Sequence, residues 1–160
     1  MDAFGFNAEL GWPRKGPTTM EYKEFNYGTD DGTQFFLGWG SVATAQTRYF
    51  RHQIEYWNNL TSHPNYDAFW QARSVLPHLR NIKPAVMVVG GWFDAEDLYG
   101  ALQTFGTIDR GNPASGSFLV MGPWCHGCWE SNRAVGPFDP ASSTGAFFRE
   151  SLELPFFNHY

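Results

Sequence analysis

Four side chains capable of acid–base chemistry lie in two short stretches of the second half of the chain. Asp94, Glu96 and Asp97 follow one apolar run, and His126 follows another, 32 positions after Asp94. A carboxylate that accepts the Nδ1 proton of a histidine fixes the tautomer of the ring and leaves its other nitrogen free to act as general base on a serine. Asp94 and His126 are candidates for this pairing. The alternative is that Asp94 caps a helix and His126 is an ordinary loop residue.

The segment around these residues is expected to form a strand–helix–strand unit. Residues 85–89 are a continuous apolar run followed by two glycines, which is typical of a strand buried on both faces. A helix is expected near 97–105 and a second buried strand at 117–121. Such a crossover is right-handed and makes the strands parallel, so the loops at their carboxyl ends should meet. Open α/β sheets hold their active sites at these ends.

The first half of the chain has a different pattern. Residues 1–40 show no steady period and are expected to be irregular or capping structure. Residues 42–60 carry apolar side chains at spacings of three and four, which predicts one helix with Ser41 as its N-cap. A second helix is expected to begin at Pro64, since proline suits the first turn of a helix.

The remainder of the second half is expected to contain two loops and one helix. Residues 106–116 and 122–140 are rich in glycine and proline and are expected to be loops. A last helix should begin after Ser142 or Ser143 and run almost to the end of the chain.

Composition excludes several classes of partner. The net charge is −5 and Lys/Arg runs are absent from the sequence, so a nucleic acid is not an expected partner. No apolar run approaches the roughly 18 residues that span a bilayer. The first residues lack the charged and apolar regions of a signal peptide. We therefore expect a soluble chain without a membrane partner, whose cellular compartment stays open.

Three stretches carry a resemblance to a known family. They read Gly-Gly-Trp-Phe-Asp-Ala-Glu-Asp at 90–97, Val-Met-Gly-Pro-Trp-Cys-His-Gly at 120–127 and His-Pro-Asn-Tyr-Asp-Ala-Phe-Trp at 63–70. The first two look like the acid and histidine motifs of the X-Pro dipeptidyl-peptidase-like serine hydrolases, a group that includes cocaine esterase. The third is similar to the end of their helical cap. Within the group, the chain most resembles the α-amino acid ester hydrolases, over roughly residues 10–160.

The resemblance implies a fold and a division of the chain. The fold would be α/β, the C-terminal part of an α/β-hydrolase fold with helical cap elements. Residues 1–80 would belong to the helical cap region, and residues 81–160 to the C-terminal part of the hydrolase domain. In the family the serine lies upstream of the cap, and a β-sandwich domain follows the hydrolase domain. The chain is therefore interpreted as the middle of a longer enzyme, which the resemblance allows to be periplasmic or secreted and to form homo-oligomers.

The resemblance also implies roles for the site residues. Asp94 would be the acid of a catalytic triad and His126 its base. The expected substrate-binding residues are Glu96, Asp97, Trp92 and Tyr99. Carboxylates at the positions of the first two hold the α-ammonium group of the substrate in the ester hydrolases, although a further acid of that cluster has no match here. The alternative is that both simply favour a helix N-terminus. The substrate would be a small ester, amide or short peptide, and no cofactor or metal is expected.

The nucleophile of such an enzyme is missing from the sequence. An elbow requires G-x-S-x-G after a strand, and the sequence contains no such string. The nearest stretch, at 141–145, follows the histidine and is interpreted as a helix cap. We therefore predict that this polypeptide alone is inactive. A second hypothesis is a non-catalytic fragment or interaction remnant of the family.

Two cysteines flank the histidine in the stretch Trp-Cys-His-Gly-Cys at 124–128. The pattern resembles the Trp-Cys-x-x-Cys of thioredoxin-like oxidoreductases, which gives a dithiol redox protein as a third hypothesis. The residues that follow do not start an amphipathic helix, and too few remain to complete that fold. A metal site would lack a convincing fourth ligand. The favoured interpretation is two incidental cysteines beside the histidine.

Overall fold

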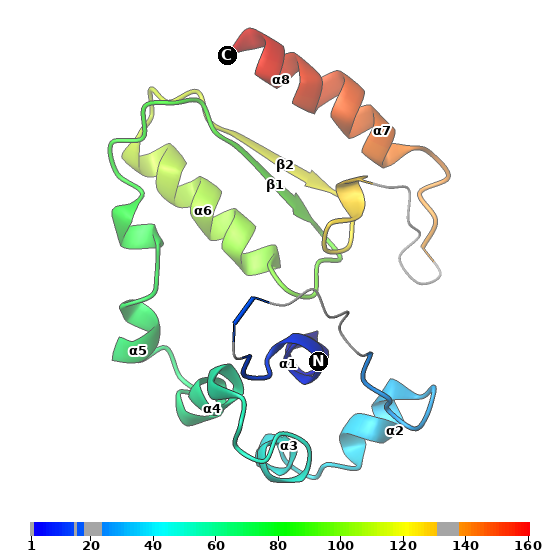
Figure 1. Ribbon diagram of the computed structural model, residues 1–160. Helices are drawn as coiled ribbons and strands as arrows, with labels where there is room; N and C mark the ends of the chain where they lie inside the picture. The colour runs from blue at the N-terminus through cyan, green and yellow to red at the C-terminus, as the bar shows by residue number, and fades with distance from the viewer. Residues whose placement is uncertain (1, 15, 18–23, 131–137) are drawn as a thin grey trace. The chain divides into compact units, whose positions relative to one another are not determined.

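The computed structural model describes residues 2–14, 16–17, 24–130 and 138–160 (Figure 1). The chain divides into two compact units, Met1–Arg73 and Ser74–Tyr160. We call these the N-terminal unit and the C-terminal unit and describe each by itself. The division expected from the sequence, after residue 80, lies a few residues farther along the chain.

The N-terminal unit is helical. Its helices are α1 (Asp2–Leu10), α2 (Gly32–Leu37), α3 (Val42–Arg48), α4 (Glu55–Ser62) and α5 (Ala68–Gln71). The expectation that residues 1–40 are irregular is therefore wrong, because this range contains α1 and α2. Glycine and asparagine lower the helix propensity of α1, and burial of its Phe4 and Ala8, one turn apart, outweighs that cost. Asp31 caps α2 by accepting a hydrogen bond from Gln34 N at 3.1 Å.

The single helix predicted over 42–60 is also wrong, since two helices fill this range. Arg51 and His52 interrupt it with φ of 49° and 59°, in the left-handed region that an α-helix does not include. Ser41 does occupy the N-cap position of α3, although its side chain makes no capping hydrogen bond.

The next helix begins later than the sequence suggested. It is α5, which starts after Asp67 and not at Pro64. The Asp67 carboxylate accepts hydrogen bonds from Phe69 N at 3.0 Å and pairs with His63 Nδ1 at 2.7 Å. This N-cap carboxylate fixes the helix start, and the proline ahead of it lies in the connecting turn.

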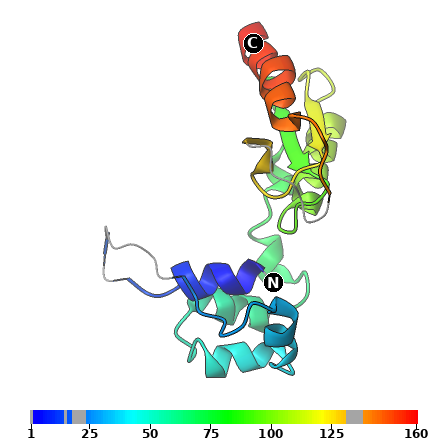
Figure 2. The same ribbon diagram turned by 90° about the vertical axis from the view of Figure 1, so that its right-hand side faces the viewer.

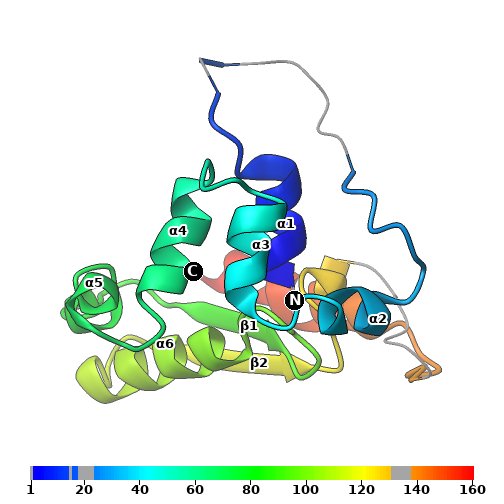
Figure 3. The same ribbon diagram turned by 90° about the horizontal axis from the view of Figure 1, so that it is seen from below.

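Aromatic rings dominate the core of the N-terminal unit. The buried core residues are Phe4, Ala8, Trp39, Ala45, Phe50, Ile54 and Trp57. Figure 3 shows the helices that supply most of them, α1, α3 and α4, grouped together. The segment with the weakest sequence pattern, α1, thus provides a central residue of this core.

The C-terminal unit holds a two-stranded parallel sheet and the helices that flank it. Its elements are η1 (Leu76–His78), β1 (Met87–Gly91), α6 (Leu98–Gly111), β2 (Phe118–Gly122), η2 (Cys128–Glu130), α7 (Thr144–Phe148), η3 (Arg149–Glu153) and α8 (Leu154–His159). The strands pair in parallel from Met87↔Phe118 to Gly91↔Gly122. This confirms the predicted pair of neighbouring parallel strands, each shifted by one or two residues from its expected start.

Helix α6 is longer than predicted and continues through Gly106 to Gly111, so the expected loop 106–116 is wrong in its first half. Ala101 and Ile108 are buried on one face of the helix, and this burial offsets the roughly 1 kcal/mol that a glycine costs inside a helix. Asn112 ends the helix: its Nδ2 donates to Ile108 O at 3.1 Å and its Oδ1 accepts from Ile82 N at 2.6 Å.

The last helical segment agrees with the prediction. It begins at Thr144, directly after Ser143, and runs through α7, the π-helical η3 and α8 to His159. The loop predicted at 122–140 contains the short turn η2, and residues 131–137 of it lie outside the described residues.

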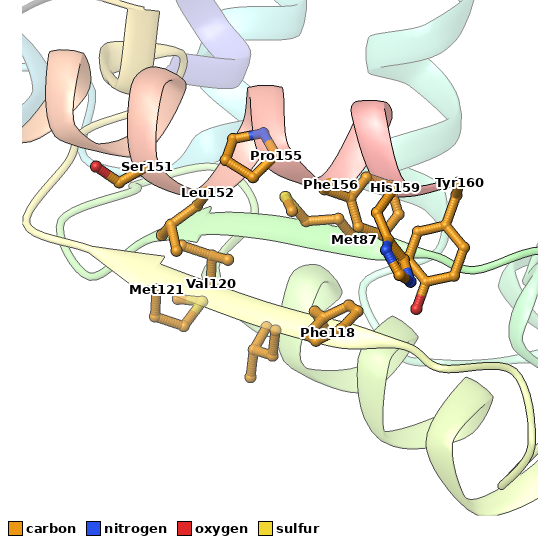
Figure 4. A pocket seen from close by; sticks show the side chains of 11 residues that line it. Met87, Phe118, Val120, Met121, Ser151, Leu152, Pro155, Phe156, His159 and Tyr160 are labelled. Carbon is orange, nitrogen blue, oxygen red and sulfur yellow. The ribbon is translucent and has the colours of Figure 1, made fainter.

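The sheet lies between two helical layers, with α6 on one face and α7–α8 on the other (Figure 2). Val89, Val120 and Leu152 pack against a buried cluster of Trp124, Cys128 and Phe148 on the α7 side. Both strands, η3 and α8 line an apolar cavity of about 590 Å³ on this side of the sheet (Figure 4). Phe118 meets Phe156 there with ring centroids 5.9 Å apart.

Among the described residues, no helix is both long enough and apolar enough to cross a membrane.

Candidate active site

Asp94 lies in the turn that joins β1 to α6, and its backbone N–H and both of its carboxylate oxygens have partners. Its backbone N–H donates to Gly91 O at 3.1 Å. Its Oδ1 accepts hydrogen bonds from Glu96 N at 2.8 Å and Asp97 N at 2.9 Å. Its Oδ2 lies 3.0 Å from His126 Nδ1. Because one oxygen is held by the backbone, the other can point only at the histidine, and the side chain is 4% exposed.

His126 lies in a tight turn after β2. Cys128 N donates to Cys125 O at 3.0 Å, and Gly127 has a φ of 70°, which favours glycine. A disulfide joins Cys125 and Cys128 across the turn. The interpretation of the cysteines as incidental is therefore wrong: they are bonded to each other and clamp the turn. The His126 side chain is 56% exposed, so one face of its ring stays open to a reacting group.

Backbone hydrogen bonds hold the two loops against each other. Trp92 N donates to Gly122 O at 2.9 Å, and Phe93 N donates to Trp124 O at 3.0 Å. The Trp124 side chain is buried, donates from Nε1 to Thr144 Oγ1 at 3.0 Å and packs on Phe148 of α7. The distance between the acid and the histidine is thus set by main-chain contacts and by the helix that follows.

Gly91→Ala is expected to separate these loops. An added Cβ would overlap Trp124 O, a backbone atom that cannot move without breaking its hydrogen bond from Phe93 N. We expect a loss of about 1–3 kcal/mol in the free energy of unfolding, measured by urea denaturation of the purified chain. Gly127→Ala meets no atom within 4 Å and changes only the backbone preference, so it serves as a control for steric overlap. Equal stability of Gly91→Ala and the wild type would contradict this prediction.

The pair has the electrostatics of a general base and its orienting acid. The hydrogen bond to Asp94 raises the pKa of His126 above its ordinary value; burial opposes the rise and nearby negative charges add to it. For Asp94, burial favours the neutral form, yet hydrogen bonds from two backbone N–H groups and from His126 hold the pKa of this carboxyl below its ordinary value. Near neutral pH, a charged acid therefore faces a histidine that binds protons readily.

Two further carboxylates stand on the exposed side of the pair. Glu96 Oε2 lies 3.6 Å from His126 Nε2, and the Glu96 side chain is 53% exposed. Asp97 is the N-cap residue of α6, and its side chain extends over Gly100, where any Cβ would overlap it. Among the described residues, His126 is the only cationic side chain within ion-pairing distance of Asp94 or Glu96, and no such partner lies near Asp97. The site therefore carries surplus negative charge beside the base.

The other two expected site residues are placed differently. Trp92 and Tyr99 have exposed side chains. In the part of the chain that the structure describes, neither side chain forms a hydrogen bond or ring contact with His126. Their assignment to substrate binding stays a prediction.

The structure also adds residues that sequence reasoning missed. The Trp129 ring meets the His126 ring edge to face, with centroids 6.4 Å apart. Phe93 and Phe138 pair at 5.3 Å beside the acid turn. The position of Trp129, three residues after the histidine in a short turn, was a usable signal for the first contact. The second pairs residues far apart in the sequence and left no local pattern.

A metal centre has no support in the described part of the chain, where no group of His, Cys, Asp and Glu side chains is arranged to hold an ion.

Comparison with known proteins identifies the family. Residues 3–128 match the sequence model of the X-Pro dipeptidyl-peptidase S15 family. No curated protein matches the chain significantly. The match spans most of the chain and includes both strands, the acid turn and the histidine turn. The mixed helical and parallel-sheet structure of the C-terminal unit is consistent with part of an α/β-hydrolase fold. The chain therefore belongs to the X-Pro dipeptidyl-peptidase S15 family, a family of serine hydrolases with an α/β-hydrolase-type fold.

Proposed function

We propose that this chain supplies the acid and the base of a serine hydrolase that cleaves esters or amides through an acyl-enzyme. The observation that carries the proposal is the contact of 3.0 Å between Asp94 Oδ2 and His126 Nδ1 at the ends of two neighbouring parallel strands. The two backbone hydrogen bonds to Asp94 Oδ1 support it, because they leave the acid one orientation.

The mechanism follows from this geometry. Asp94 accepts a hydrogen bond from the Nδ1–H group of His126, which keeps the proton on Nδ1 and so presents Nε2 as the basic nitrogen. Nε2 takes the proton of the serine hydroxyl as its oxygen attacks the carbonyl carbon, and then gives that proton to the leaving alcohol or amine. Water repeats the sequence on the acyl-enzyme. Asp94 stays ionised and stabilises the imidazolium that forms in each step.

The substrate class that we favour carries an α-ammonium group next to its acyl carbon, as in amino acid esters and in dipeptides released from a free N-terminus. Glu96 and Asp97 supply the negative charge for this group, and they have no Lys or Arg partner among the described residues. A cation bound between carboxylates relieves their mutual repulsion. Trp92 and Tyr99, exposed on the same loop and helix, are proposed to contact the acyl side chain.

A second candidate function rests on the sequence itself. G-x-S-x-G is absent from the 160 residues, which favours a family member without turnover of its own. The experiment described next distinguishes the serine hydrolase from the family member without turnover. Only the serine hydrolase requires His126 to act on a serine nucleophile.

The test compares two polypeptides in hydrolysis of alanine methyl ester and in labelling by a fluorophosphonate. The first is the 160-residue chain, for which we expect neither turnover nor a labelled serine. The second is the chain extended upstream through the reading frame to any G-x-S-x-G that the frame encodes. We expect both signals there, with turnover lost in His126→Ala. Turnover by the short chain that disappears in His126→Ala would place a nucleophile inside it and contradict the prediction of inactivity. An extended polypeptide that is labelled but equally active without His126 would overturn the proposed roles.

A further inference from the structure

The nitrogen that a serine hydrolase needs as its base faces a carboxylate in this structure. His126 Nδ1 lies 3.0 Å from Asp94 Oδ2, and His126 Nε2 lies 3.6 Å from Glu96 Oε2. Asp94 is fixed by two backbone N–H groups, whereas the Glu96 side chain is 53% exposed and forms no hydrogen bond within the described part of the chain that would hold it in place. The Asp94 carboxylate is therefore anchored beside the ring, whereas the Glu96 side chain can rotate away from it.

Carboxylates at both ring nitrogens favour a proton on each nitrogen. A histidine with N–H groups at Nδ1 and Nε2 is the imidazolium, which has no lone pair to accept a proton from serine. The groups that face the ring are the carboxylates of Asp94 and Glu96, the Asp97 charge farther off and the uncharged Trp129 ring. Among the described residues, no Lys or Arg side chain pairs with these acids. With Glu96 beside Nε2, the protonated form of His126 is favoured, and that form cannot act as the base.

We propose that Glu96 couples substrate binding to activation of the base: it pairs with His126 Nε2 in the free site and moves to the α-ammonium group of a substrate when one binds. The inference rests on the proposed function, which gives Glu96 and Asp97 that ammonium group. Once Glu96 turns to the substrate, the Nε2 proton passes to solvent, and the ring keeps only its Nδ1 proton, bonded to Asp94. Nε2 then accepts the serine proton.

The coupling makes Glu96 a specificity-determining residue. A neutral ester of the same size leaves Glu96 paired with His126, so the base stays protonated. The site therefore selects substrates that carry an ammonium group in two ways: through contact with that group and through the protonation state of His126. Coupling between two equilibria is reciprocal. Ammonium binding therefore lowers the proton affinity of His126, and removal of that proton strengthens ammonium binding.

The experiment is a pH titration of the His126 ring by NMR in the full 160-residue chain, with the signal assigned by His126→Gln. The probes are alaninamide, which carries an α-ammonium group, and propanamide, which does not. The variants are Glu96→Gln, Asp97→Asn and Asp94→Asn. Glu150→Gln, an exposed acid in η3, is the matched control. The titration of alaninamide itself is recorded without protein.

We expect Glu96→Gln to lower the pKa of His126 by more than Asp97→Asn does, and Glu150→Gln to leave it unchanged. Alaninamide should lower the pKa of His126 in the wild type, propanamide should not, and alaninamide should have no effect in Glu96→Gln. An unchanged pKa of His126 in Glu96→Gln would overturn the inference. So would alaninamide that shifts the backbone signals of Glu96 and Asp97 but leaves the titration of His126 where it was.

Failure of the proposed function gives a different result. If the acid–base pair is absent in solution, Asp94→Asn leaves both the pKa of His126 and its ring tautomer, read from the ¹⁵N shifts, as in the wild type. If only the coupling is absent, Asp94→Asn changes both and Glu96→Gln changes neither. No binding of alaninamide at any pH overturns the coupling and the ammonium assignment together, while the acid–base pair is still judged from Asp94→Asn.

Discussion

Asp94→Asn is expected to lower kcat about 10⁴-fold in a polypeptide that contains both this chain and the serine nucleophile. The measurement is hydrolysis of an amino acid ester at saturating substrate and neutral pH. The size of the effect comes from the histidine tautomer, since a base whose proton sits on Nε2 cannot accept one from serine. The structure explains why neither orientation of an asparagine amide at position 94 preserves both the turn and the histidine tautomer.

An asparagine has one acceptor oxygen and one donor NH₂ group, whereas both carboxylate oxygens of Asp94 accept hydrogen bonds. If the amide oxygen takes the place of Oδ1, the NH₂ group faces His126 Nδ1 and drives the ring proton to Nε2. If the amide is flipped, the NH₂ group faces the N–H groups of Glu96 and Asp97, which now donate at 2.8 and 2.9 Å. The first orientation keeps the turn and destroys the base, and the second breaks the turn.

Asp109→Asn is the matched control, because it makes the same chemical change at an exposed position of α6. It should leave kcat unchanged. A loss of less than tenfold in Asp94→Asn would mean that another acid orients His126, and Glu96 would be the first to examine because it is the other carboxylate within 4 Å of the ring.

The acid–histidine region was the most predictable part of the molecule, for physical reasons. An apolar run that ends in Gly90-Gly91 has few alternatives to a buried strand, and parallel strands bring their carboxyl-end loops together whatever the sequence between them. The pairing of Asp94 with His126 in space follows from these two facts. The contact between Glu96 and His126 Nε2 does not, because it depends on a side-chain direction that local sequence leaves open.

The disulfide and the N-terminal helices were not predictable in the same way. Cys125 and Cys128 have a spacing that suits a disulfide, a metal site and a redox centre alike, and only the turn geometry distinguishes them. The break between α3 and α4 lies at Arg51 and His52, and neither residue type adopts a positive φ as readily as glycine does. Helix α1 has poor propensity, and its stability comes from tertiary contacts that a local pattern does not contain.

Phe4→Ala tests that last point and should destabilise the N-terminal unit by about 3–5 kcal/mol. Phe4 is 1% exposed and lies at the centre of the aromatic core. The rings that meet it are those of Phe25, Tyr27, Phe35, Phe36, Trp39, Tyr49, Phe50 and Trp57. These rings come from α2, from α4 and from the segments before α2, after α2 and between α3 and α4, so they cannot all close into the space that alanine leaves. The cost therefore includes a cavity as well as lost apolar burial.

Hydrogen exchange measured by mass spectrometry locates the effect within the chain. In Phe4→Ala, peptides from α3, from α4 and from the turn between them should exchange faster, by the factor that corresponds to the lost stability, because Ala45, Phe50 and Trp57 in this region share the core with Phe4. Phe6→Ala is the matched control, since Phe6 lies on the same helix but is 58% exposed. Its exchange should stay close to that of the wild type. Equal exchange in the two variants would mean that α1 is not part of the folded core in solution. The sequence-based expectation that residues 1–40 are irregular would then describe this segment better than its packing against the aromatic core does.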